Sequence, residues 1–240
     1  MENVTQDILN VGVNDRTITL FEGQYHVANG MAYNSYLILD EKIAVMDTVD
    51  PRATEEWLQN LKEALQDRTV DYLVIQHMEP DHGGSILELM ALFPNMKLVG
   101  NAKTFSMFGQ FFDADIDGKT VLVKEGDTLL LGKHTLQFIM APMVHWPEVM
   151  VTYDQTDNVL FSADGFGKFG TRDAEEDCLL RRDHRAGHHP QTARRNETEL
   201  IKIRMEGKNM REFMDKDFLL GTETARRLFH DYAEHMPLVD

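Results

Sequence analysis

Four side chains that can bind a metal ion lie within six residues of one another in the stretch His77-Met78-Glu79-Pro80-Asp81-His82-Gly83-Gly84. This stretch follows an apolar run that we predict as a buried strand. Side chains alternate between the two faces of an extended chain, so His77, Glu79 and Asp81 should point to one side, with His82 following at the turn. A solvated loop that only caps the next helix rarely concentrates so many donors. We therefore predict a metal site here.

Two further candidate ligands come at the ends of apolar runs later in the chain, His145 after TLQFIMAPMV and Asp164 after NVLFSA. A single histidine or aspartate at a strand end often only caps the chain or binds backbone. If both runs are strands of packed sheets, however, their ends meet the His77 loop along one edge. Because a carboxylate has two oxygens, Asp164 could bridge two metal ions and make the site dinuclear.

The donor set favours iron or manganese over zinc. Glu79, Asp81 and Asp164 supply three carboxylates beside three imidazoles, whereas dinuclear zinc sites of hydrolases are usually richer in histidine. Carboxylates also stabilise the oxidised state of a metal. Two such ions with open positions can reduce a small diatomic molecule, or they can activate a bridging water for hydrolysis. The ligands alone leave both reactions open.

Composition argues against several kinds of partner. The chain of 240 residues is 42% hydrophobic and has a formal net charge of -16, which disfavours nucleic acid and anionic membrane surfaces. The first residues, MENVTQDILNVGVNDR, lack the basic start and apolar core of a signal peptide, and no apolar stretch reaches bilayer length. Cys178 is the one cysteine, which excludes an internal disulfide and a cysteine-based metal site. We expect a soluble, cytoplasmic protein.

The elements that must position the ligands follow from hydrophobic periodicity. Between Thr17 and Met46, three short β-rich runs separated by turn residues predict an antiparallel meander. Strands and helices then alternate, which indicates an α/β layer, and beyond Gly118 the pattern returns to strands. The predicted helices are residues 53–65, 85–92 and 102–112, and the predicted strands after the meander are residues 72–75, 97–99, 120–124, 128–132, 135–141, 149–154 and 158–164.

The order of these elements predicts an α/β fold in which two sheets pack face to face with helices outside. The composition changes after about Gly170, where Arg, Glu, Asp and His replace large apolar residues. We expect residues 1–170 to form the main domain and residues 171–209 a polar, poorly ordered linker. Residues 210–240 recover an apolar spacing of four, which predicts a C-terminal helix.

Several motifs, in the same order along the chain, resemble those of the flavodiiron proteins. They are Gly30-Met-Ala-Tyr33-Asn34-Ser-Tyr36, the His77 stretch with Glu79 where hydrolases of the fold usually have a second histidine, His145-Trp146-Pro147, and Phe161-Ser-Ala-Asp164 with Phe166-Gly167. The resemblance covers about residues 1–170. It implies a metallo-β-lactamase-like αββα sandwich, here truncated. It also implies two iron ions that reduce dioxygen to water or nitric oxide to nitrous oxide.

The resemblance also implies a division of the ligands between the two irons. His77, Glu79, His145 and Asp164 would hold one iron, and Asp81, His82 and the bridging Asp164 would hold the other. Family members give the second iron one more histidine, usually in a Ser-His-Gly-Pro setting, and this sequence has no such segment. The remaining histidine cluster, His184, His188 and His189, has solvated surroundings and is a poor substitute.

Partners follow from the same resemblance. In this family electrons reach the irons from the FMN of a flavodoxin-like domain, for which the sequence shows no phosphate-binding loop. We therefore expect FMN on another domain or polypeptide, a flavodoxin-like or other redox donor protein, and a homodimer. Two alternatives stay open: a dinuclear metal-dependent hydrolase of the same fold, against which Glu79 argues, and a catalytically incompetent fragment.

The last residues carry a second resemblance. Residues 210–240 resemble the amino-terminus of bacterial uronate isomerases, a family in which a metal-binding His-x-His would follow just after Asp240. The hypothesis is that the chain joins a truncated flavodiiron domain, a linker and the start of another reading frame.

Overall fold

The structure is a computed structural model that describes residues 2–165, 169–172 and 200–202. Within these ranges no helix is long and apolar enough to cross a membrane. The predicted C-terminal helix and the histidine cluster near residue 188 lie outside the described residues. The candidate ligands from His77 to Asp164 all lie inside them.

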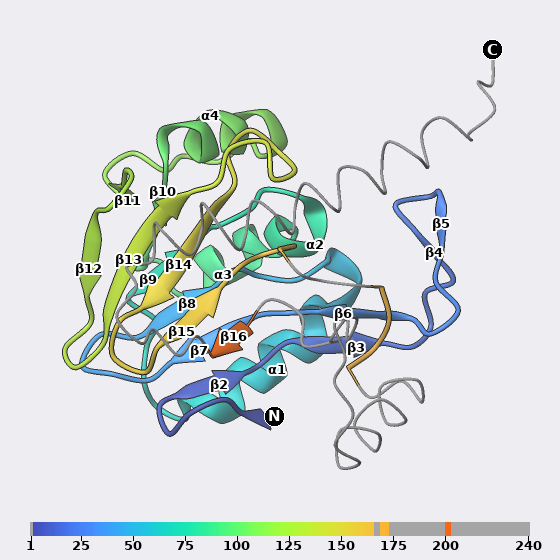
Figure 1. Ribbon diagram of the computed structural model, residues 1–240, viewed down its shortest axis with the longest axis horizontal. Helices are drawn as coiled ribbons and strands as arrows, with labels where there is room; N and C mark the ends of the chain where they lie inside the picture. Colours follow the sequence, from blue (N-terminus) through green and yellow to red (C-terminus); the bar gives the residue numbers. More distant parts are fainter. Residues whose placement is uncertain (1, 166–168, 173–199, 203–240) are drawn as a thin grey trace, which may run out of the picture. The chain divides into compact units, whose positions relative to one another are not determined.

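A seven-stranded sheet forms the centre of the fold, with its strands in the order β1-β2-β7-β8-β9-β10-β11 (Figure 1). Neighbours from β1 to β8 are antiparallel, and neighbours from β8 to β11 are parallel. Its strands are β1 Glu2–Asn3, β2 Ile8–Asn10, β7 Tyr36–Ile38, β8 Ala44–Met46, β9 Tyr72–Val74, β10 Lys97–Gly100 and β11 Thr120–Leu122.

A second, antiparallel sheet has five strands in the order β12-β13-β14-β15-β16. They are β12 Thr128–Leu130, β13 Thr135–Met140, β14 Met150–Asp154, β15 Val159–Phe161 and β16 Leu200–Lys202. Two small strand pairs complete the described β structure: β3 Val13–Asp15 with β6 Met31–Tyr33, and β4 Leu20–Phe21 with β5 Tyr25–His26.

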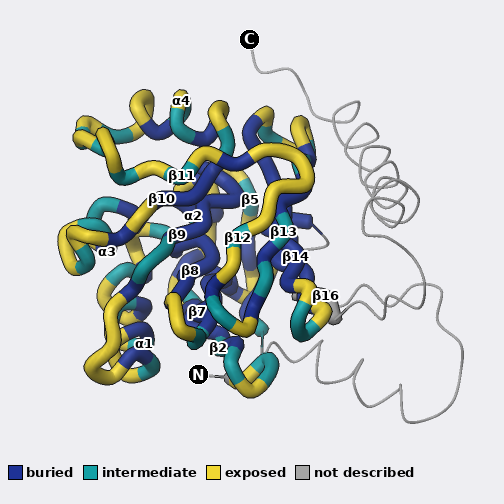
Figure 2. The backbone as a smooth tube through the Cα atoms, turned by 90° about the vertical axis from the view of Figure 1, so that its left-hand side faces the viewer, coloured by how far each residue is buried: buried dark blue, intermediate teal, exposed yellow. Residues whose placement is uncertain are grey.

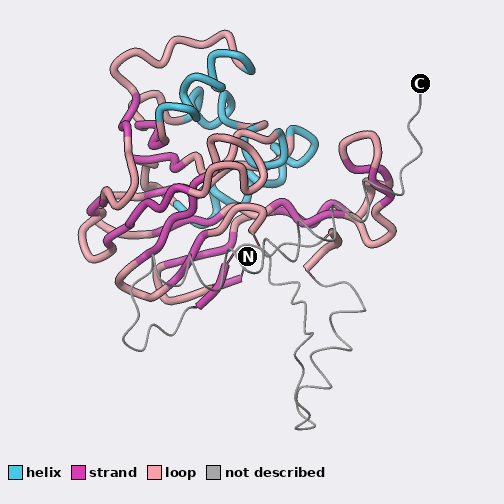
Figure 3. Tube along the Cα trace, turned by 45° about the horizontal axis from the view of Figure 1, so that its top comes forward, coloured by secondary structure: helices cyan, strands magenta, loops and turns pink. Residues whose placement is uncertain are grey.

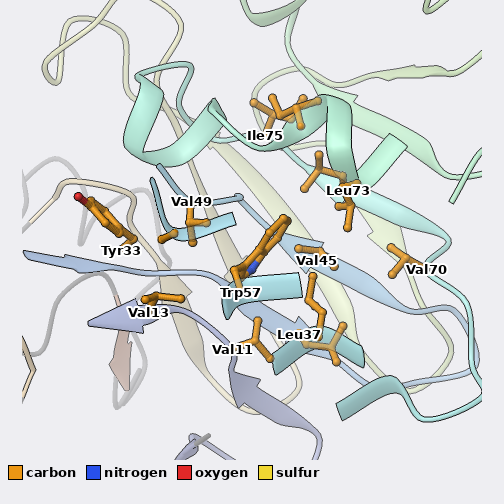
Figure 4. Packing of buried hydrophobic residues seen from close by; sticks show 14 of the residues in the cluster. Val11, Val13, Tyr33, Leu37, Val45, Val49, Trp57, Val70, Leu73 and Ile75 are labelled. Atoms are coloured by element: carbon orange, nitrogen blue, oxygen red, sulfur yellow. The ribbon is translucent and has the colours of Figure 1, made fainter. Parts of the chain in front are cut away.

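Helices cover one face of the seven-stranded sheet. They are η1 Pro51–Ala53, α1 Thr54–Leu65, α2 Pro80–Gly83, α3 Ile86–Leu92 and α4 Ala102–Phe111. The apolar stripe of α1, with Trp57 at its centre, packs on Leu37 and Val45 of the sheet (Figure 4). Trp57 is fully buried, and burying such a side chain contributes about 1.5–3 kcal/mol. The helical spacing in the sequence therefore places α1 correctly.

The two sheets bury a second core between them. In β8 the alternation of side chains sends Val45 toward the helices, while Ala44 and Met46 face the other sheet, where they meet Phe138 and Phe161. The tube in Figure 2 is accordingly most deeply buried along the central strands. Figure 3 shows the helices gathered on one side of the strands. The described residues thus form three layers: helices, one sheet and a second sheet.

The fold class predicted from the sequence is confirmed in this core. Several features differ from the prediction. The strand run beyond Gly118 divides between the sheets, because β11 pairs in parallel with β10 whereas β12 begins the second sheet. Strands β1, β2, β3, β5 and β6 were not predicted, and β4 pairs with β5 outside the seven-stranded sheet instead of joining β7 and β8 in the predicted meander. Strand β16 pairs with β15 although it lies in the segment predicted to be a linker.

Candidate metal centre

The stretch after β9 changes conformation halfway. The backbone stays extended through Ile75, whose N–H donates to the carbonyl of Val99 at 2.9 Å. Glu79 is also extended, with φ -59° and ψ 145°, and Pro80 then opens α2, because its fixed φ suits the first helical position. The extended alternation predicted from His77 to Asp81 therefore ends at Glu79. Asp81 instead lies on the helical turn, where it groups with His82.

The first group of donors consists of His77, Glu79, His145 and Asp164, each with one ligand atom within 4.8 Å of the others. Its core is Glu79 Oε2, which lies 2.9 Å from His77 Nε2 and 3.0 Å from His145 Nε2. Asp164 Oδ2 lies 3.1 Å from His145 Nε2 and 3.3 Å from His77 Nε2. Two imidazoles and two carboxylates from three separate segments of the chain thus lie close together.

The second group consists of Asp81, His82 and Asp164. His82 Nε2 lies 2.7 Å from Asp164 Oδ1 and 3.6 Å from Asp81 Oδ2. Asp164 therefore turns one oxygen to each group, which is the arrangement that a bridging carboxylate needs. All six residues that the sequence singled out lie in these two groups. Their role as metal ligands remains a prediction.

Buried carboxylates that the sequence did not reveal stand behind the imidazoles. Glu148 Oε1 lies 2.8 Å from Nδ1 of His77, and Asp47 Oδ2 lies 3.6 Å from Nδ1 of His82. Asp47 is at the end of β8, in a left-handed conformation with φ 53°. Glu148 comes three residues after His145, so its position beside that motif was a signal that could have been used.

The charges of the cluster determine its pKa values. Burial, and after it the nearby charges of Asp164 and Glu79, raise the pKa of Asp81 to about 6 despite the opposing charge of His82. Burial alone would raise the pKa of Asp164, but the surrounding imidazoles hold it well below its usual value. Hydrogen bonds to Asp164 and Glu79 raise the pKa of His145 to about 9. Without an ion, the imidazoles must supply the positive charge here.

A further carboxyl group, that of Glu22, contacts the first group of donors. Glu22 lies in the turn between β4 and β5, and its hydrogen bond with Glu79, together with burial and the charge of Glu79, raises its pKa to about 7. No pattern in the sequence around residue 22 predicted this contact. The excess of carboxyl groups over imidazoles makes the centre a strong attractor for cations.

The donors fit a pair of hard metal ions. Oxygen and imidazole nitrogen are the ligands that iron and manganese accept. Asp81 Oδ1 is buried without a hydrogen-bond partner among the described residues, and a buried carboxylate oxygen in that state is costly unless a cation binds it. The second group nevertheless has fewer described ligands than the first, three residues against four.

A third acidic group lies elsewhere. His134, Asp154 and Asp157 approach one another, but Asp154 already accepts hydrogen bonds from Nδ1 of His134 at 3.0 Å and from the backbone of Asp157 at 2.9 Å. These hydrogen bonds stabilise the turn that follows β14. The group therefore has a structural explanation without a metal ion.

Fold and site together define a metallo-β-lactamase-type α/β protein with two adjoining, carboxylate-rich groups of candidate metal ligands. Residues 31–208 match the family described as ODP family beta lactamase, and the chain belongs to that family. Among curated relatives, the anaerobic nitric oxide reductase flavorubredoxin of Pectobacterium atrosepticum is 41% identical over 169 residues, which are 69% of this chain and 33% of that protein. The chain thus spans about a third of the length of such relatives.

Solved structures agree with this assignment. The flavodiiron protein from Giardia intestinalis superposes with a TM-score of 0.67 and 31% identity, covering 76% of this chain and 46% of its own. Rubredoxin oxygen:oxidoreductase from Desulfovibrio gigas superposes with a TM-score of 0.66 and 33% identity, covering 71% of this chain and 42% of its own. The resemblance to flavodiiron proteins is therefore confirmed for the β-lactamase-type part.

Proposed function

We propose that the chain carries the diiron site of an oxidoreductase that reduces dioxygen to water or nitric oxide to nitrous oxide. The observation that carries the proposal is the position of Asp164, whose two oxygens face two separate donor groups at 2.7 Å and 3.1 Å from His82 and His145. The names of the relatives, a nitric oxide reductase and an oxygen oxidoreductase, support this reaction class.

In this proposal His77, Glu79, His145 and Asp164 hold one iron, while Asp81, His82 and Asp164 hold the other. The irons, when bound, supply the redox chemistry at which the diatomic molecule is reduced. The chain's own part is to fix the geometry and the charge. Three carboxylates would offset the positive charge of oxidised iron, and the ring of Trp146 packs against the ring of His77, with the two centroids 5.2 Å apart.

Electrons come from outside the described residues. We propose an FMN group on a flavodoxin-like domain or on a partner protein, with a rubredoxin-like or other redox donor upstream, as the relatives' names suggest. A homodimer and a cytoplasmic location are parts of the same proposal. The net charge of -16 suits a donor protein that presents a basic patch.

The division of the chain also remains a proposal. Residues 1–170 would hold the metal site, residues 171–209 would form a linker that returns to add β16, and residues 210–240 would form a helical tail resembling the amino-terminus of uronate isomerases. Sequencing the source locus across the codons for Gly170 and Met210 tests the fusion hypothesis. A single native reading frame without a junction would contradict it.

The reaction is tested with protein purified and loaded with ferrous iron without oxygen. A reduced flavoprotein donor is added, and consumption of oxygen and of nitric oxide is followed at separate electrodes. We expect consumption of at least one gas by the wild-type chain, loss of it in Glu79→Ala, and retention in Asp157→Ala, which alters an acidic side chain away from the site. Zinc-dependent ester hydrolysis without gas consumption would favour the hydrolase, and inactivity with every metal would favour an incompetent fragment.

A further inference from the structure

Glu148 lies directly behind His77, on the side away from the candidate metal. Neither side chain is exposed to solvent, and Glu148 Oε1 lies 2.8 Å from Nδ1 of His77. The same oxygen accepts the backbone N–H of Met78 at 2.9 Å. One carboxylate oxygen therefore contacts both the ring of residue 77 and the peptide group that follows it.

The backbone contact fixes the direction of the ring contact. The N–H of Met78 donates to Oε1, and an ionised carboxylate can only accept hydrogen bonds, so Nδ1 of His77 carries the proton that it shares with Oε1. In a neutral ring the lone pair then belongs to Nε2, which faces Glu79 Oε2 at 2.9 Å. The tautomer that Glu148 selects is thus the one that leaves Nε2 free to bind a metal.

Glu148 is itself held in place from two directions. Asn101 Nδ2 donates to the Glu148 carbonyl at 2.6 Å, while Oδ1 of Asn101 caps the start of α4 through the backbone of Lys103 and Thr104. The N–H of Met150 donates to the carbonyl of Gln76 at 3.1 Å, which joins β14 to the residue before His77. The backbone of Glu148 thus lies where hydrogen bonds connect the two sheets.

Three of the four residues from His145 to Glu148 lie against His77. His145 shares Glu79 Oε2 with it, the ring centroid of Trp146 lies 5.2 Å away at 89°, and Glu148 holds Nδ1. Rotation of the His77 ring would break the hydrogen bond at Nδ1 and would bring the ring into steric conflict with the indole of Trp146. A single loop therefore supplies one candidate ligand and immobilises another.

We propose that Glu148 is a positioning residue of the first metal group: it fixes the tautomer and orientation of His77 so that Nε2 binds the metal. The inference rests on the proposed metal site, but it does not require iron or gas reduction. Carboxylates behind metal-binding histidines commonly raise metal affinity by about 10–100-fold. Glu148 would do so here without touching the metal.

Zinc(II) is the probe, because it is diamagnetic and independent of the redox function. In the zinc-loaded wild-type chain, ¹⁵N NMR of the imidazole should show His77 bound through Nε2 with a proton on Nδ1. Competition with a chromophoric chelator gives the affinity. We expect Glu148→Ala to lower zinc affinity by about 10–100-fold and to lose the single His77 signal. Glu148→Gln keeps an oxygen for both donors and should retain the Nδ1–H tautomer and most of the affinity.

Asp154→Ala is the matched control. It breaks an equally buried carboxylate–imidazole pair, with His134 at 3.0 Å, in a place that touches no candidate ligand. We expect it to leave zinc affinity unchanged. The inference is overturned if Glu148→Ala keeps wild-type affinity, if Asp154→Ala loses as much, if Glu148→Gln behaves like Glu148→Ala, or if the wild-type chain binds zinc through Nδ1 or not at all. Wild-type zinc binding as expected, without gas reduction by the iron form, would remove only the reductase proposal.

Discussion

Replacing Gly84 by alanine should disturb the second metal group from a distance. Gly84 directly follows α2, two residues after His82, and its φ of -65° is ordinary for any residue. Space is the constraint: a Cβ atom would lie 2.4 Å from both the Pro80 carbonyl oxygen and Cδ of Pro51. Neither a backbone carbonyl nor a proline ring can rotate away, so α2 must move relative to η1.

The magnitude follows from this rigidity. Overpacking costs about 1–3 kcal/mol, and two unyielding contacts place Gly84→Ala near the upper end, at about 3 kcal/mol of unfolding free energy. For a chain of this size that corresponds to a melting temperature lower by about 6–12 °C. Gly83→Ala is the matched control, because its Cβ would meet nothing closer than 3.3 Å. Its cost should stay below about 1 kcal/mol, since alanine also favours the helix.

Urea unfolding of the metal-free variants measures the difference. The two variants should unfold with the same dependence on urea, but Gly84→Ala at a lower midpoint. Zinc titration should show weaker binding at the Asp81 and His82 group in Gly84→Ala alone, because the movement of α2 carries His82 away from Asp164. Equal midpoints for Gly83→Ala and Gly84→Ala would refute the steric reasoning.

Three further predictions concern the core, the pH dependence and the bridge. Phe138→Ala removes a fully buried ring between the sheets and should lower the unfolding free energy by about 3–5 kcal/mol in urea; a loss within experimental error would contradict the packing. The hydrogen bond to Asp154 raises the pKa of His134 above 6.5 despite burial. Because the folded-state pKa is the higher one, this stabilisation is fully present below about pH 6.5 and is lost as pH rises through the folded-state value. Urea midpoints measured against pH should therefore fall over that window in the wild-type chain but not in Asp154→Asn, and parallel curves would contradict the assignment. Asp164→Asn should weaken the binding of both metal ions, whereas Asp81→Asn should weaken the binding of only one. The number of ions retained per chain after dialysis, determined by metal analysis, measures the difference. Equal losses of metal from the two variants would argue against a bridging Asp164.

Much of this architecture could be predicted because the central strands are short apolar runs bounded by turn residues. The continuous apolar run of β8, the partial alternation in β13 and the helical spacing around Trp57 indicate which segments are buried. The six candidate ligands were predicted for a related reason. Each follows an apolar run, and the ends of such runs meet at one edge of a packed pair of sheets.

What the sequence did not reveal depends on contacts between distant segments. The separation of Asp81 from His77 follows from a helix of four residues that Pro80 begins, which is too short for a periodic signal. Folding brings Glu148 to His77, from which it is separated by 71 residues in the sequence. It likewise brings Glu22 to Glu79. Short edge strands such as β1 have too few residues to show alternation.

Metal content per chain tests the central claim most directly. The chain is purified without oxygen, stripped of metal, titrated with ferrous iron and freed of excess ion before elemental analysis, with Asp164→Asn treated in parallel. The account predicts about two irons per wild-type chain, and fewer in the variant because both groups share Asp164. One iron or none in the wild-type chain, or the same iron content in the variant, would contradict a dinuclear site bridged by Asp164.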